Sequence, residues 1–110
     1  MPPDETPNPP PQTLLILVNS NRNFEAVGQL AAAATGRGKD VQVHLMDEGL
    51  ELVVSKAFLS LCRTAKVTLC AAGIVKNARQ FPTSLPDGVD IVPPSQLAGR
   101  LDRCQRNVVF

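Results

Sequence analysis

The first strongly patterned segment of the chain is an apolar run from Thr13 to Val18 that is flanked by polar residues. Consecutive apolar positions are typical of a central strand in a parallel sheet, because helices cover both faces of such a strand. Apolar residues then recur at helical spacing from Phe24 to Ala34, and the following 36–38 segment, Gly-Arg-Gly, predicts the end of that helix. Either Asn21 or Asn23 is placed to cap its start.

The same two patterns alternate along the rest of the chain. Further strands are predicted at 41–46, 66–70, 89–92 and 108–110. Further helices are predicted at 50–61, 71–78 and 95–104. This alternation predicts an α/β fold, in which helices on both faces of a five-stranded, mainly parallel sheet form a three-layer α/β/α sandwich. The pattern does not reveal the order of the strands.

The first twelve residues have a different composition. They contain six of the ten prolines, and their only charged side chains are those of Asp4 and Glu5. Such a segment has little apolar surface to bury, so we expect a disordered, Pro-rich tail over 1–12 and one folded domain over 13–110. A ligand for a proline-binding partner is the alternative to a plain solvated tail. The segment lacks the apolar stretch of a secretory signal.

Charge and composition exclude several classes of partner. The 110 residues carry a formal net charge of +1, and the aromatic residues are four Phe with no Tyr or Trp. We therefore expect no nucleic-acid partner, because both the basic surface and the stacking side chains are missing. The longest apolar run, Leu14 to Val18, is far shorter than the roughly 20 residues of a membrane span. Three cysteines without a CxxC pair predict neither a disulfide framework nor a zinc site, and they favour a reducing, cytoplasmic setting.

Ligands of open parallel sheets bind beyond the carboxyl ends of the strands. Three predicted loops qualify, at 19–22, 47–49 and 70–72. The first is polar but has no Gly-rich phosphate-binding pattern, so a small-ligand-binding module based on it is only an alternative. Asp47 and Glu48 are adjacent in the chain and do not form a convincing acid/base pair, while Gly49 is expected to provide a turn into the next helix. The candidate substrate contacts in these loops are Asn19, Asn21, Asp47, Gly49 and Ala71.

Cys70 is the candidate nucleophile, at the junction between a predicted strand and a predicted helix. Free amides and the helix dipole at such a junction favour a thiolate, and the small residues 71–73 leave room for a substrate. A buried, inert cysteine is the competing interpretation. Cys62 is expected in the core, Cys104 in the core or at its rim, and His44 as a solvated or hydrogen-bonded structural residue. No Cys/His or Ser/His/Asp set and no metal site can be assembled.

Several ordered segments resemble the DsrE/DsrF-like sulfur-relay proteins. Gly38 to Leu50 is similar to the second strand and the following turn of that family, and Lys66 to Gly73 is similar to the strand that carries its sulfur-handling cysteine. Leu85 to Val89 resembles the next loop and strand, and residues 95–110 resemble the closing helix and strand. The resemblance covers residues 13–110. It implies a DsrE-like sandwich of flavodoxin-like topology that assembles into homo-oligomers, usually trimers or hexamers.

The same resemblance implies a function for Cys70. In members of the family that keep the cysteine, it carries a persulfide in sulfur relay, which would make donor and acceptor proteins the partners, with no cofactor and no membrane. Lys76 or Arg79 is then the candidate to stabilise an anionic sulfur. Whether such transfer would be enzymatic is left open. A non-catalytic oligomeric scaffold of the same fold is the main alternative.

Overall fold

The computed structural model describes residues 13–76 and 85–110. Several predicted features lie outside the described residues: the tail over 1–12, residues 77–78 of the third predicted helix, Arg79, and residues 82–84 of the loop that follows. The elements are β1 (Thr13–Val18), α1 (Phe24–Gly36), β2 (Asp40–Leu45), the 3₁₀ helix η1 (Asp47–Val54), α2 (Ala57–Thr64), β3 (Lys66–Cys70), α3 (Ala71–Lys76), β4 (Asp90–Val92), α4 (Ser95–Arg103) and β5 (Arg106–Val109).

The five strands form one parallel sheet in the order β4-β3-β2-β1-β5. In the centre of the sheet, Ile16 of β1 is paired with Val43 of β2, and His44 of β2 is paired with Thr68 of β3. The α/β class predicted from the pattern is therefore confirmed. The flavodoxin-like topology is not found in its strand order: the edge strand beside β1 is β5, whereas in the flavodoxin order, 2-1-3-4-5, it is β2.

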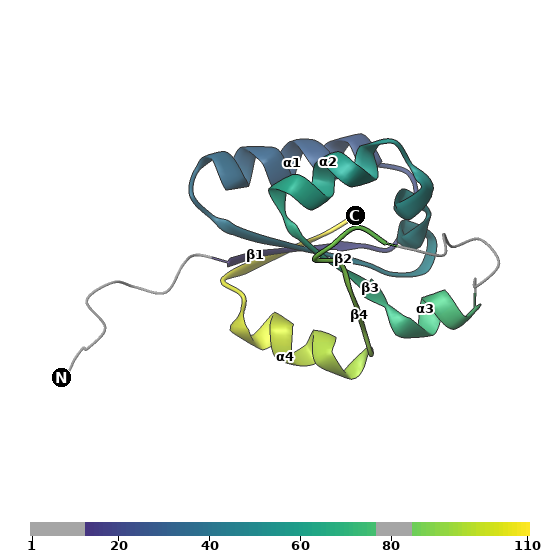
Figure 1. Ribbon diagram of the computed structural model, residues 1–110. Coiled ribbons are helices and arrows are strands. Elements are labelled where there is room, and N and C mark those ends of the chain that lie inside the picture. The colour runs from purple at the N-terminus through teal and green to yellow at the C-terminus, as the bar shows by residue number, and fades with distance from the viewer. Residues whose placement is uncertain (1–12, 77–84) are drawn as a thin grey trace.

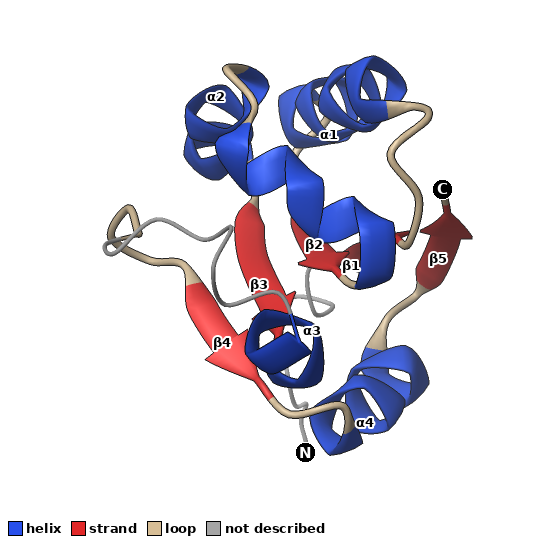
Figure 2. Cartoon of the chain, turned by 90° about the vertical axis from the view of Figure 1, so that its right-hand side faces the viewer, coloured by secondary structure: helices blue, strands red, loops and turns tan. Residues whose placement is uncertain are grey.

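The helices cover both faces of this sheet. Helices α1 and α2 lie on one face and α4 lies on the other, while α3 lies on the side of α4, beyond the end of β3 (Figures 1 and 2). The connections from β1 to β2 and from β2 to β3 cross the sheet in one direction, whereas the connection from β4 to β5 returns in the other. Since crossovers between parallel strands are right-handed, this reversal places α4 opposite α1 and α2.

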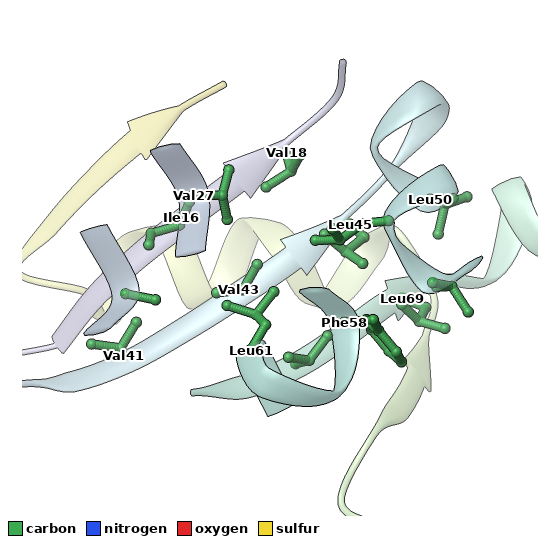
Figure 3. Close-up of a cluster of buried hydrophobic side chains, with 14 of the residues drawn as sticks. Ile16, Val18, Val27, Val41, Val43, Leu45, Leu50, Phe58, Leu61 and Leu69 are labelled. Carbon is green, nitrogen blue, oxygen red and sulfur yellow. The ribbon is translucent and has the colours of Figure 1, made fainter. Parts of the chain in front are cut away.

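The main hydrophobic core lies between the sheet and helices α1 and α2. Alternate strand residues such as Ile16, Val43 and Leu69 are fully buried there and pack with Val27 of α1 and Phe58 of α2 (Figure 3). Each such side chain stabilises the fold by about 1.5–3 kcal/mol relative to exposure. This layer therefore holds the central strands, and with them the ends of β1, β2 and β3, in fixed positions.

The prediction of one continuous helix over 50–61 is wrong. The segment is divided into η1 and α2 by Ser55, whose backbone is extended. The side-chain Oγ of Ser55 accepts a hydrogen bond from the N–H of Ala57 at 3.2 Å, and its carbonyl oxygen accepts one from the N–H of Phe58. Ser55 therefore caps the start of α2. The apolar spacing continues across the break because both helices bury the same side.

Candidate functional site

The loops that follow β1 and β2 meet at the carboxyl edge of the sheet. The N–H of Met46 donates to the carbonyl oxygen of Val18 at 2.9 Å, which joins the two strand ends. Asn19 is exposed, and its N–H donates to Phe110 at 2.8 Å. The side-chain amide of the exposed Asn21 donates to both carboxylate oxygens of Glu51, at 3.2 and 3.3 Å. The first predicted loop is thus tied to η1.

Asp47 and Gly49 begin η1 and have different surroundings. Asp47 is exposed and adopts a left-handed backbone conformation with φ of 51°, which Asp tolerates better than most residues. Gly49 is buried, and a Cβ at this position would overlap the carbonyl oxygen of Val18. The N–H of Gly49 donates to the carbonyl oxygen of Met46 at 2.8 Å, which forms the expected turn into the helix. Gly49 is in addition a point of close backbone approach between η1 and β1.

Cys70 is the last residue of β3, and α3 follows it without a break. Its side chain is 7% exposed and its thiol is free. Ala71 is half-buried at the start of α3, and a Cβ on Gly73 would overlap Leu50 of η1 and lie 3.9 Å from the backbone nitrogen of Asp47. The segment after Cys70 and the segment at Asp47 are therefore packed against each other. Lys76 is the last residue of α3.

A polar network lies on the sheet face that bears α4. Because side chains alternate along a strand, Gln42 and His44 share the face opposite to the main core. The Nδ1 atom of the fully buried His44 lies 2.9 Å from Oγ1 of Thr68, and Nη1 of Arg100 donates to the same Oγ1 at 2.6 Å. Nε and Nη2 of Arg100 donate to Oε1 of Gln42 at 3.0 and 2.7 Å.

Burial beneath α4 determines the charge state of His44. Burial, with a smaller contribution from the nearby Arg100 guanidinium, lowers the pKa of His44 to about 4. Burial and the neighbouring Arg103 also lower the pKa of Arg100. The imidazole is therefore neutral at physiological pH. The hydrogen-bonded structural role expected for His44 is confirmed, whereas its link to Arg100 was not predicted.

The other two cysteines lie away from this edge. Cys62 is half-buried against the main core, as expected, and burial raises the pKa of its thiol. Cys104 is also half-buried, and its Sγ donates to the carbonyl oxygen of Leu101 at 3.3 Å. Among the described residues there is no group of three potential metal ligands. Helices of membrane-spanning length and hydropathy are likewise missing from the described ranges 13–76 and 85–110.

The described residues thus define a three-layer α/β/α protein in which loops at the carboxyl edge of a parallel sheet gather beside a free cysteine at the end of β3. Its fold is similar to that of the crystal structure of the ychN protein from E. coli, a protein of the DsrE-like fold, with a TM-score of 0.68. The two sequences are 18% identical, and the match covers 91% of this chain and 99% of that chain. At this identity the similarity shows the fold alone. No protein-family model and no curated protein matches the sequence.

Proposed function

We propose that this chain is a small sulfur carrier, or a sulfurtransferase-like protein, that relays sulfane sulfur through a persulfide on Cys70. The observation that supports the proposal best is the position of Cys70. It is a free thiol at the carboxyl end of a central strand, where open α/β folds bind their ligands. The next three residues, 71–73, have the smallest side chains, so little side-chain bulk has to move when a donor approaches the sulfur.

The proposed step requires no redox partner. The Cys70 thiolate attacks the outer sulfur of a donor persulfide, R–S–SH, and the donor S–S bond breaks. The donor leaves as the thiolate RS⁻ with the electron pair of that bond, and Cys70 becomes Cys70–S–SH. An acceptor thiolate then repeats the attack on the outer sulfur. Since the Cys70 side chain is only 7% exposed, donor binding must open the segment that follows it.

The neighbouring loops have proposed roles in this step. Asn19, Asn21 and Asp47 are exposed and available to contact a donor protein at the same edge. Lys76 and Arg79 are proposed to stabilise the anionic sulfur. The three cysteines, all within the described residues, are free, in keeping with a cytoplasmic location and with donor and acceptor proteins as partners.

Intact-protein mass spectrometry after treatment with glutathione persulfide tests the proposal. We expect the wild-type protein to gain the mass of one sulfur atom, and a Cys70→Ser variant to gain none. A Cys62→Ser, Cys104→Ser double variant is the matched control and should gain sulfur like the wild type. Equal sulfur gain by Cys70→Ser and the wild type would show that Cys70 is not the carrier.

A second candidate function is a non-catalytic, oligomeric scaffold or interaction subunit. The exposed apolar residues Val54 and Leu59 favour it, because an apolar patch at the surface is often covered by a partner. Val54 and Leu59 also border a groove of about 470 Å³. A homo-oligomer, such as a trimer or a hexamer, is compatible with either function. Cys70 alkylation at the rate of an ordinary buried thiol would favour the scaffold.

A further inference from the structure

One atom of the polar network has no hydrogen-bond partner among the residues that the structure describes. The side chain of His44 is fully buried, and its Nε2 makes no hydrogen bond within the described part of the chain. Buried polar atoms are nearly always hydrogen-bonded, because leaving one without a partner costs about 1–3 kcal/mol. An acceptor that reaches this atom would therefore be stabilised by the hydrogen bond that it completes.

The network also determines where the imidazole proton lies. Arg100 can only donate, so Oγ1 of Thr68 accepts its hydrogen bond. The one acceptor within the described residues for the Thr68 hydroxyl proton is Nδ1 of His44. The single proton of the neutral ring then lies on Nε2, in agreement with the lowered pKa of His44. Nε2–H is thus a buried donor that lacks an acceptor within residues 13–76 and 85–110.

Cys70 lies near His44, on the neighbouring strand β3. The pairing of His44 with Thr68 places Cys70 two residues further along β3, and the alternation of side chains puts both on the face that bears α4. Because strands lie about 4.8 Å apart and rise about 3.3 Å per residue, the Cα atoms of such diagonal neighbours are roughly 8 Å apart. The thiol itself does not accept a hydrogen bond from Nε2. A persulfide extends about 2 Å further, the length of one S–S bond.

We infer that His44 positions the persulfide, with its Nε2–H donating a hydrogen bond to the outer sulfur of Cys70–S–S⁻. This inference rests on the proposed function. Thr68 and Arg100 hold the imidazole in the donor tautomer, and the Arg100 cation adds a favourable field at the anionic sulfur. No proton or electron is transferred in this contact. His44 lowers the free energy of the persulfide anion relative to its protonated form, and so extends the lifetime of the carried sulfur.

The test compares persulfide lifetime and persulfide pKa in three variants. His44→Phe removes the donor, His44→Gln places an amide N–H near the position of Nε2, and Thr68→Val removes the hydroxyl that selects the tautomer while keeping its shape. Each protein is loaded with glutathione persulfide, separated from the donor, and followed by intact mass. The pKa of the persulfide is read from the pH dependence of its alkylation by iodoacetamide. Thermal unfolding verifies that each variant is folded.

We expect the His44→Phe protein to lose its persulfide about tenfold faster than the wild type, and the alkylation profile to move to higher pH. His44→Gln should restore most of the lifetime, and Thr68→Val should shorten it even if His44→Phe does not fold. Equal lifetimes and alkylation profiles in the wild type, His44→Phe and Thr68→Val would overturn the inference while leaving the carrier role of Cys70 intact. Absence of a persulfide on wild-type Cys70 would overturn both.

Discussion

His44 is buried as a neutral imidazole near the Arg100 cation, and its burial makes stability depend on pH. Its pKa is about 4 in the folded protein, against an ordinary value of 6.5 in the unfolded chain. Between these values the unfolded chain binds a proton that the folded protein does not, so stability falls as the pH falls from 6.5 towards 4. Above pH 6.5 the residue has no effect.

Urea denaturation at several pH values measures this dependence. The expected loss is about 1.4 kcal/mol for each unit by which the two pKa values differ. The non-titrating His44→Gln variant should lose less stability over the same pH range. If the free energy of unfolding of this variant falls with pH as steeply as that of the wild type, a group other than His44 causes the pH dependence.

Gly49 is the residue at which the smallest change should have the largest structural effect. A Cβ there would overlap the backbone of Val18, so Gly49→Ala must push η1 away from β1. We expect a loss of about 2 kcal/mol or more. Gly28 of α1 is the matched control, because a Cβ there meets nothing within 4 Å, and Gly28→Ala should stabilise the helix by up to about 1 kcal/mol. Equal effects of the two substitutions in thermal unfolding would contradict this account.

At the scale of elements, α4 is attached to the sheet differently from the other helices. None of its residues, all of them described, is buried, and Arg100 makes its hydrogen bonds to Gln42 and Thr68. Arg100→Met should therefore release α4, because it leaves two acceptors without their donor. We expect a destabilisation of about 1–3 kcal/mol and faster amide hydrogen exchange in α4. Arg103→Ala is the control and should leave exchange in α4 nearly unchanged.

The sequence pattern was a good guide to the strands and a poorer guide to the connections. The buried strand at 13–18 is predictable because consecutive apolar residues have few other uses in a short chain, and the strand at 66–70 because apolar residues alternate with polar ones. The break at Ser55 was missed because apolar spacing records which side is buried, and a 3₁₀ helix and an α-helix can bury the same side. The turn at Gly49 is predictable, but its close approach to the backbone of β1 is not, because that approach depends on where the neighbouring strand lies.

The candidate site was predicted only in part for a similar reason. The loops after β1, β2 and β3 could be assigned to one edge because all parallel strands end on the same side. The network of His44, Thr68 and Arg100 could not be predicted. Arg100 and Gln42 are 58 residues apart in the chain, and their contact follows from the strand order. The one available signal was the alternation of polar Gln42 and His44 with apolar residues on a strand buried on both faces.

At the scale of the whole molecule, the fold brings its chemistry to one place. The return of β5 to the far side of β1 puts α4 under the central strands, so that Arg100 reaches the same sheet face as Cys70. The main core lies on the opposite face and does not involve this network. Changes at Cys70 and at His44 should therefore be separable from changes in the core.

The central claim is that Cys70 receives and passes on sulfane sulfur. Its most direct test is a pulse and chase with glutathione persulfide whose outer sulfur is labelled with a heavy isotope, followed by peptide mass spectrometry of the three cysteines. The account predicts label on the Cys70 peptide, which disappears when an excess of an unlabelled acceptor thiol is added and appears on that thiol. Label confined to Cys62 or Cys104, or label on Cys70 that no acceptor thiol can remove, would contradict it.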